Sequence, residues 1–143
     1  KMDGKDYRTF CLLGDGELQS GQNWEAAMFA PHYNLRRLTV FVDRNRLQIS
    51  GCTCEVMNLE PLADKWRSFG WNVLEIDGHD DVSAILDACD RADRADRPTC
   101  VILNTVKGKG VSFMENKAEF HGKSCNCDQN ECAMREIREK IGK

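Results

Sequence analysis

The sequence predicts an α/β domain with a three-layer, mostly parallel β-sheet. Short apolar runs typical of buried strands lie at residues 9–13, 38–42, 71–76 and 99–104. Between these runs, apolar residues recur at helical spacing, and this alternation of strand and helix is typical of parallel sheets with crossover helices. The length of 143 residues suits one ordinary hydrophobic core, so we expect one domain.

The first predicted strand and the first predicted helix flank a glycine turn. Residues 9–13 are almost entirely apolar, a pattern that predicts a strand buried on both faces. The helix over 24–33 is apolar nearly all round and is therefore expected to be buried, with Ser20 or Asn23 as its N-cap. Pro31 has no backbone N–H, so we expect it to end or kink this helix early.

The middle of the chain continues the alternation. After the strand at 38–42, a polar loop that contains glycine spans residues 46–54. A helical stripe of apolar residues then ends at Gly70, which stands where a C′ glycine is expected, and residues 71–76 form the next strand. The members of the stripe are Leu59, Leu62, Ala63, Trp66 and Phe69.

The last third is predicted to contain two helices and one strand. The turn at 77–80 is expected to cap a helix, and His79 within it is expected to be solvated rather than catalytic. The buried strand at 99–104 leads into a loop at 107–110, and the final helix begins at Asp128 or Asn130. The helix after the turn at 77–80 has an apolar stripe of Val82, Ile85, Leu86 and Cys89. Its C-terminal end is expected to carry the cations Arg91, Arg94 and Arg97. The final helix has Ala133, Ile137 and Ile141 on one face.

Composition excludes several classes of protein. Hydrophobic residues at 41% and charged residues at 30% are globular values, and a net charge of −3 without a basic stripe argues against a nucleic-acid surface. No apolar run approaches the roughly 20 residues of a membrane span, and no signal-peptide pattern opens the chain. We therefore expect a soluble cytoplasmic protein that binds neither nucleic acid nor membrane. Because the first residue is Lys1, we expect the chain to start within a domain.

The eight cysteines allow three interpretations. Some lie in apolar or helical surroundings, where a free thiol behaves as a small hydrophobe. Others have C-x-C spacing, which is shorter than the roughly two to four intervening residues of structural zinc sites. A disulfide framework is typical of secreted scaffolds, which nothing else in the sequence supports. The first group is Cys11, Cys89 and Cys100, and the second is Cys52 with Cys54 and Cys125 with Cys127, near Cys132.

Polar residues at the ends of two predicted strands form the candidate site. Asp15 follows the strand at 9–13 within a Gly-Asp-Gly turn, and Asn45 follows the strand at 38–42. In open α/β sheets ligands bind at the carboxyl edge, where both residues are expected to lie. The Asp15 carboxylate, the Asn45 amide oxygen and the Leu47 carbonyl are the hard oxygen ligands that magnesium prefers.

A magnesium ion with so few protein ligands typically also binds phosphate oxygens, such as those of a diphosphate. Gly16 has no Cβ and allows the backbone to approach a diphosphate closely. Dinucleotide binding fits less well, because the turn does not follow G-x-G-x-x-G and an acid within it would repel a pyrophosphate unless a cation lies between them. Residues 107–110 could hold a phosphate, but they lack the frame of a P-loop.

The spacing within this site resembles a known cofactor motif. Gly14-Asp15-Gly16, an interval of 28 residues (17 to 44) and then Asn45 resemble the thiamine diphosphate motif. The surrounding sequence is more specific, because several segments are similar to the N-terminal subunit of split, bacterial-type transketolases. These segments are GDGELQSGQNWEAAMFAPHYNL, DRNRLQISG, EPLADKWRSFGW, EIDGHD, TVKGKGVSFMEN and EFHGK. This likeness covers nearly the whole chain.

The resemblance implies an activity, two cofactors and their contact residues. The activity is ketol transfer, in which thiamine diphosphate and Mg²⁺ help to pass a two-carbon unit between sugar phosphates. His121, in Phe120-His121-Gly122, is implied as a catalytic residue near the reacting end of the cofactor. The implied metal ligands are Asp15, Asn45 and the Leu47 carbonyl. The implied cofactor contacts are Gly14, Asp15, Gly16, Asn45, Leu47 and His121.

The resemblance also implies an assembly. Residues 1–143 correspond to the C-terminal part of a transketolase N-terminal thiamine diphosphate-binding domain. The family has further histidines upstream of the GDG strand, and a C-terminal subunit supplies the glutamate that activates the cofactor and an arginine that binds substrate phosphate. We therefore expect a dimer of such pairs in the pentose phosphate pathway, and no activity without the missing parts.

Two alternatives stay open. The chain could be a noncatalytic fragment or interaction subunit that keeps the fold without turnover. It could also be another thiamine diphosphate enzyme, although deoxyxylulose-phosphate synthase and the alpha subunit of 2-oxo-acid dehydrogenases have different residues around their GDG turns. One departure from the transketolase pattern is Ser20, which stands where the family usually carries a glutamate in an acidic network that links paired active sites.

Overall fold

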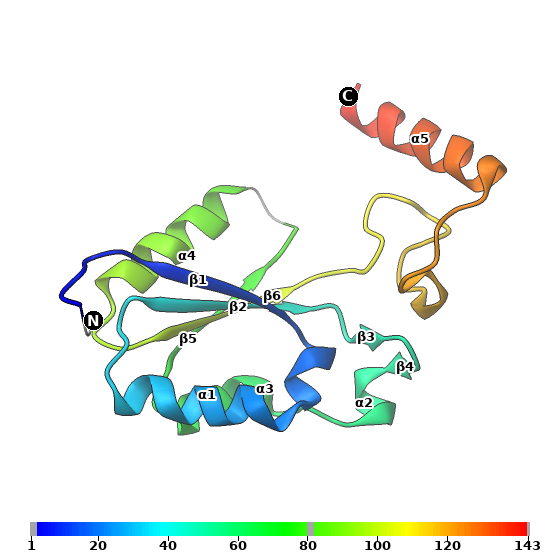
Figure 1. Cartoon of the computed structure of the whole chain (residues 1–143). Helices are drawn as coiled ribbons and strands as arrows, with labels where there is room; N and C mark the ends of the chain where they lie inside the picture. Colours follow the sequence, from blue (N-terminus) through cyan, green and yellow to red (C-terminus); the bar gives the residue numbers. More distant parts are fainter. Residues whose placement is uncertain (1–2, 80–81, 143) are drawn as a thin grey trace.

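A parallel four-stranded sheet forms the centre of the molecule (Figure 1). The structure, a computed structural model, describes residues 3–79 and 82–142. The strand order is β1-β2-β6-β5, and each neighbouring pair runs parallel. The strands are β1 (Thr9–Gly14), β2 (Leu38–Arg44), β5 (Asn72–Asp77) and β6 (Thr99–Asn104). The predicted parallel sheet is therefore confirmed.

Helices on both faces of the sheet make the three layers that the sequence predicts. Figure 1 shows α1 (Gly21–His32) and α3 (Leu62–Ser68) below the sheet and α4 (Val82–Arg94) above it. A two-stranded antiparallel hairpin of β3 (Leu47–Gln48) and β4 (Gly51–Cys52) follows β2. The remaining elements are the 3₁₀ turns η1 (Gly16–Gln19) and η2 (Ala118–Phe120) and the helices α2 (Thr53–Val56) and α5 (Cys127–Ile141).

The larger part of the core lies between the sheet and the α1 and α3 layer. Its members include Leu18, Val42, Leu62, Trp66, Trp71, Cys100 and Ile102. A smaller cluster of Leu74, Ala88 and Val101 lies under α4. The strand β6 contributes to both clusters because it lies inside the sheet and alternates its side chains between the two faces. Its predicted burial is confirmed.

The strand β1 lies at the edge of the sheet, and its predicted burial on both faces is wrong. Among the described residues it pairs only with β2, and the side chains of Phe10 and Leu12 are 48% and 70% exposed. Cys11, expected in apolar surroundings, is exposed as well. An apolar run indicates what a strand is able to bury, but the strand order decides which faces are covered.

Helix α1 continues through Pro31 to His32. Proline removes the N–H that would bond the Ala27 carbonyl one turn earlier. Instead, the indole N–H of Trp71 donates to that carbonyl over 2.7 Å. The predicted early end of the helix is therefore wrong. Its predicted full burial is wrong too, because Met28 and Phe29 are more than half exposed.

The other helices match the predicted positions but differ in detail. Gly70 follows α3 with φ +91°, so its predicted role as a C′ glycine is confirmed. In α4 the buried residues are Ala88 and Ala92, whereas Val82 and Leu86 of the predicted stripe are exposed. Small alanines face the sheet there because they allow close approach. Asp80, part of the predicted cap of α4, lies outside the described residues.

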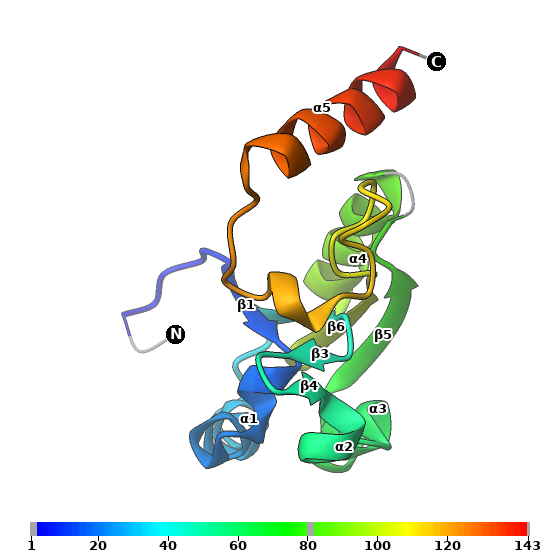
Figure 2. The ribbon, with the colours of Figure 1, turned by 90° about the vertical axis from the view of Figure 1, so that its right-hand side faces the viewer.

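Helix α5 lies apart from the three layers, as Figures 1 and 2 show. It begins one residue before the predicted Asp128, because Asn126 and Gln129 form a capping box. Glu136 accepts hydrogen bonds from the backbone N–H and the hydroxyl of Ser112, each 2.7 Å long, and Lys140 donates to the Gly110 carbonyl. The helix is thus attached to the loop that follows β6. Across the described residues, none of the helices combines the length and apolar character required to cross a membrane.

Candidate functional site

The candidate site lies where the strands of the sheet end, the edge that faces the viewer in Figure 2. β1 and β2 are neighbours, with Gly14 in register with Asp43. Asp15 and Asn45 each follow the end of one of these strands, and the Asp15 N–H donates to the Asp43 carbonyl over 3.0 Å. The structure therefore brings the two predicted ligands to the same point of the sheet edge.

The Asp15 carboxylate is buried and is held by two backbone groups. Asp15 is only 2% exposed. One oxygen accepts from the Gly16 N–H at 2.8 Å and the other from the Arg46 N–H at 2.6 Å. Burial raises the pKa of this carboxyl above its ordinary value and Asp43 adds to that effect, although the two N–H groups oppose it. A cation at this position would stabilise the ionised form.

Asn45 and Leu47 are joined by a turn around Arg46. The Asn45 side-chain oxygen accepts from the Leu47 N–H at 3.0 Å. Arg46 between them has φ +65°, a left-handed conformation that is uncommon for a residue with a side chain. This turn directs the Arg46 N–H to Asp15, so the loop after β2 is fastened to the loop after β1.

The hairpin packs directly on the Gly-Asp-Gly turn. A Cβ at Gly16 would lie 3.3 Å from the Cβ of Gln48, which is tighter than most real contacts. Gln48 in turn accepts a hydrogen bond from Gln19 at 2.7 Å. Gly16 is therefore needed for the approach of β3, in addition to the approach of a diphosphate that the sequence suggested.

A cleft of about 490 Å³ opens beside these residues. Arg44, Arg46 and Lys109 contribute positive charge, and Asp77 contributes negative charge. This balance favours an anionic ligand such as a diphosphate. The lining residues are Arg44, Asn45, Arg46, Leu47, Cys52, Asp77, His79, Asn104, Thr105, Val106, Lys109 and Asn116.

His79 lines the cleft, a position that the sequence did not predict. Its ring Nε2 accepts from the Val106 backbone N–H at 2.6 Å, and its backbone N–H donates to the Asp77 carboxylate at 2.8 Å. A Cβ at Gly78 would lie 2.5 Å from the Thr105 side chain, so the turn after β5 packs closely on the end of β6. The signal in the sequence is an Asp-Gly-His turn that directly follows a strand.

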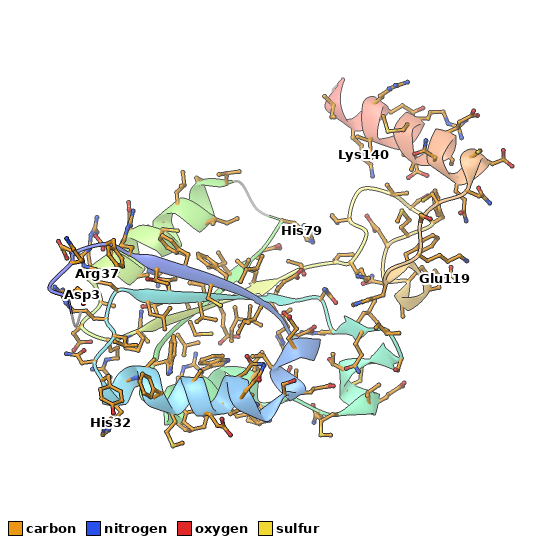
Figure 3. The ribbon with its side chains drawn as sticks, in the orientation of Figure 1. Asp3, His32, Arg37, His79, Glu119 and Lys140 are labelled. Atoms are coloured by element: carbon orange, nitrogen blue, oxygen red, sulfur yellow. A yellow bond between two sulfur atoms is a disulfide. The ribbon has the colours of Figure 1, made fainter. Side chains whose placement is uncertain are left out.

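The other two histidines lie elsewhere. His121 follows η2, is exposed, and is absent from the residues that line the cleft. Asn45 lines the cleft and His121 does not, so the predicted catalytic role of His121 stays a prediction. His32 lies in the last turn of α1, at the far end of the molecule from His79 in Figure 3.

The cysteines do not form a metal site in the described part of the chain. No group of three or more histidine, cysteine, aspartate or glutamate side chains there could hold a metal ion. Cys52 and Cys54 form a disulfide, which the sequence analysis did not favour. The six other cysteines are free, and Cys100 is the buried one among them.

The chemistry of the oxygens around Asp15 fits magnesium. Magnesium takes one or two carboxylates, neutral oxygens, phosphate oxygens and water in an octahedral arrangement. Asp15 supplies one carboxylate, and the Asn45 amide and Leu47 carbonyl supply neutral oxygens from the loop that the Arg46 N–H joins to Asp15. A site with a single acidic ligand is compatible with the lack of a cluster of acidic side chains in the described residues.

Comparison with known proteins gives a consistent result. Residues 1–142 match the family described as transketolase, thiamine diphosphate binding domain. An apulose-4-phosphate transketolase subunit of Phocaeicola vulgatus is 46% identical over 100% of this chain and 51% of its own length. The 6-deoxy-6-sulfo-D-fructose transketolase subunit SqwG of a Clostridium species is 43% identical over 98% of this chain and 51% of its own length. The chain thus spans about half the length of these curated relatives.

Solved structures show the same fold. A transketolase from Pichia stipitis, in complex with sedoheptulose-7-phosphate, aligns with a TM-score of 0.85 and 33% identity over 96% of this chain and 20% of that one. A transketolase from Campylobacter jejuni aligns with a TM-score of 0.83 and 28% identity over 96% of this chain and 21% of that one.

Proposed function

The chain belongs to the transketolase family, as part of its thiamine diphosphate-binding domain, and we propose that it is the cofactor-binding piece of an enzyme for two-carbon ketol transfer. The observation that carries this proposal is the junction of Asp15 with the loop of Asn45. The Arg46 N–H joins the two loops at one edge of the sheet, beside a cleft that contains arginine and lysine.

The residues of this junction have separate roles in the proposed site. Asp15, Asn45 and the Leu47 carbonyl would hold Mg²⁺, and Gly14 and Gly16 keep side chains away from the diphosphate. Thiamine diphosphate, when bound, supplies the carbon nucleophile for the transfer of a two-carbon unit. His121 would move a proton at a substrate hydroxyl or alkoxide. Because His121 is exposed and outside the cleft, this role requires the loop around it to be placed by cofactor, substrate or partner.

The substrates are proposed to be ketoses with an anionic end group. The two relatives are named for apulose-4-phosphate and for 6-deoxy-6-sulfo-D-fructose, which carry a phosphate and a sulfonate. The family resemblance implies the pentose phosphate pathway, and these names extend the set of substrates that should be tested. A donor panel of xylulose 5-phosphate, apulose-4-phosphate and the sulfo sugar will separate the possibilities.

A partner is part of the proposal. The relatives are named as transketolase subunits, which implies a second subunit, and the chain spans about half of their length. We propose that a C-terminal transketolase subunit completes the active site, that two such pairs assemble, and that the assembly is cytoplasmic. One observation supports the alternative of a noncatalytic fragment, namely that His121 is not among the residues that line the cleft.

The decisive test uses the complete assembly. The DNA on either side of the coding sequence will show whether the further parts that this proposal requires are encoded there, and these can be produced together with this chain. With Mg²⁺ and thiamine diphosphate in excess, the assembly is expected to transfer two-carbon units from a ketose of the panel to an aldose phosphate. Binding of the cofactors without any transfer would favour the noncatalytic alternative, and failure to bind them would refute the proposed function.

A further inference from the structure

The Cys52–Cys54 disulfide lies beside the proposed cofactor site. Cys52 ends β4 and is paired with Leu47 of β3, whose carbonyl is a proposed metal ligand. Cys52 lines the cleft beside Asn45, and both cysteines line a second cleft of about 550 Å³. Cys52 therefore borders both the cofactor cleft and a neighbouring one.

A chain of backbone contacts connects the disulfide to Asp15. Thr53, the residue between the two cysteines, is buried and donates its N–H to the Arg46 carbonyl at 3.0 Å. The backbone N–H of the same residue, Arg46, donates to the Asp15 carboxylate at 2.6 Å. The disulfide closes the ring that contains Thr53, so it restricts the peptide group that holds the Arg46 turn in place.

The position and connectivity of this disulfide suit reversible chemistry rather than permanent stabilisation. It joins residues two apart in the sequence, so it closes a very short loop and stabilises the fold little through chain entropy. Cys54 is exposed, which gives an attacking thiolate access to its sulfur. Six other cysteines are free thiols, so the pair is not part of a disulfide framework.

We infer that Cys52 and Cys54 form a redox site that exchanges with small anionic thiols and disulfides, and that its disulfide state holds the Arg46 turn in the form that binds the cofactor. Arg46 lines the second cleft together with the cysteines and would attract a carboxylate of such a thiol, whereas the charge of Arg44 in this cleft is paired with Glu60. The coupling to the cofactor rests on the proposed function, whereas the exchange reaction does not.

The reaction is a thiol–disulfide exchange in two steps. The thiolate of the small molecule attacks Cys54 Sγ, the bond to Cys52 breaks, and Cys52 leaves as a thiolate that takes a proton. A second small thiolate then attacks the mixed disulfide and releases Cys54 as a thiol. The two cysteines gain two electrons and two protons, and two small thiols are oxidised to one disulfide.

The first test measures the redox state and the backbone together on the full chain. The protein is equilibrated in buffers of glutathione and glutathione disulfide, free thiols are alkylated, and each cysteine is assigned by peptide mass spectrometry. Oxidation of Cys52 and Cys54 as a pair is expected. On reduction, amide hydrogen exchange at Arg46 and Thr53 is expected to rise about tenfold, because the Thr53 peptide is released.

Two double variants provide the controls. C52S/C54S should lose the response of Arg46 and Thr53 to glutathione. C125S/C127S removes the other C-x-C pair of the chain, whose cysteines are free, and should keep the full response. If Cys52 and Cys54 are alkylated as free thiols in excess glutathione disulfide, or if amide exchange does not depend on their state, the inference is overturned.

The second test measures the affinity of the complete assembly for thiamine diphosphate and Mg²⁺ by calorimetry. Reduction is expected to weaken binding about tenfold, as the loss of an outer partner of a metal ligand does. The C52S/C54S assembly should show the weaker affinity in both buffers. Equal affinity of the oxidised and reduced wild-type assemblies would overturn the coupling, whereas no binding in either state would refute the proposed function and leave the exchange result standing.

Discussion

Asp15 combines a buried carboxylate with two fixed N–H donors, and this combination decides what the residue can do. The N–H groups of Gly16 and Arg46 orient its oxygens without neutralising its charge. A buried carboxylate without a cation nearby is costly to ionise. The arrangement is therefore suited to a cation that arrives with the ligand, as magnesium does with a diphosphate.

The first prediction concerns the metal affinity of this residue. Asp15→Asn should weaken the binding of Mg²⁺ with thiamine diphosphate, because it removes the one charged ligand of the proposed site. The loss should exceed the roughly 10- to 100-fold that follows removal of an outer partner of a metal ligand. Calorimetric titration of the complete assembly measures it. Asp43→Asn is the matched control, because Asp43 accepts from Thr105 and is not a proposed ligand. Unchanged affinity in Asp15→Asn would disprove the assignment.

The second prediction follows from the raised pKa of Asp15. Between its ordinary value of 3.8 and the raised value, the folded chain keeps a proton that the unfolded chain has released. The folded state then binds more protons, so without metal its stability falls as the pH rises through this window. Urea unfolding at a series of pH values should show wild type losing stability relative to Asp15→Asn as the pH rises above 3.8. A constant or opposite difference would contradict the burial of this charge.

The third prediction concerns His121. His121→Ala should reduce turnover of the complete assembly by about 10²- to 10⁴-fold, the usual effect of losing a general acid or base. Cofactor affinity should change far less, because His121 lies outside the cleft that contains Asn45 and Leu47. Steady-state kinetics and calorimetry on the same preparations separate the two effects. Equal losses in both would indicate misfolding instead of a catalytic role.

At the scale of residues, site residues that follow the end of a strand could be predicted from the sequence. Contacts that depend on which strands are neighbours could not. Asp15 and Asn45 follow predicted strands, so their place at one edge could be inferred. The hydrogen bond of His79 to Val106 depends on β5 lying beside β6, which no local pattern reveals. The same applies to Thr53, whose bond to Arg46 depends on the hairpin geometry.

At the scale of elements, α1 and the residue that precedes β5 depend on one another through an unusual hydrogen bond. Pro31 leaves the Ala27 carbonyl without its helical partner, and the Trp71 indole takes that place at 2.7 Å. Both Ala27 and Trp71 are buried, so water does not easily replace the indole N–H. This contact explains how a helix with a proline in its last turn can continue to its end.

The fourth prediction tests this contact. Trp71→Phe should lower the free energy of unfolding by about 1–3 kcal/mol beyond the packing loss, because the Ala27 carbonyl stays buried without a donor. In a Pro31→Ala background the cost should be smaller, since residue 31 regains an N–H one turn after Ala27. A double-mutant cycle by urea denaturation isolates this coupling. Equal costs of Trp71→Phe in the two backgrounds would show that the indole does not replace the missing donor.

The elements were predictable to the extent that one segment determines its own structure. The four sheet strands and α3 with Gly70 follow from local pattern. The exposure of β1 does not, because an apolar strand has the same sequence at the edge and in the centre of a sheet. In α4 the larger residues suggested a stripe around Val82 and Leu86, whereas close packing selected the alanines.

At the scale of the whole molecule, the exposed apolar surface and the length of the chain both favour association with other chains. Phe10 and Leu12 of β1 and Met28 and Phe29 of α1 are exposed, and such exposed apolar groups favour association. The chain spans about half the length of its curated relatives. We therefore expect the purified chain to self-associate, and to self-associate less when the proposed partner and the other required parts are supplied.

The last prediction is that this chain by itself has no transketolase activity. Its described site provides oxygens for magnesium and a cationic cleft for a diphosphate, but His121 is exposed and is not among the residues that line that cleft. The upstream histidines and the activating glutamate that the family resemblance implies have no counterpart in these 143 residues. Holding the cofactor is not sufficient, because without activation its reacting carbon is a poor nucleophile however well it is positioned.

The assay is two-carbon transfer from xylulose 5-phosphate to ribose 5-phosphate, with Mg²⁺ and thiamine diphosphate in excess. The isolated chain should give no transfer above the rate without protein, and activity should appear only when the missing parts are added. The assembly that contains Asp15→Asn controls for activity of the added parts alone, and it should stay inactive because the cofactor is then held weakly. Turnover by the isolated wild-type chain would show that these residues contain a complete active site, and would remove the need for a partner.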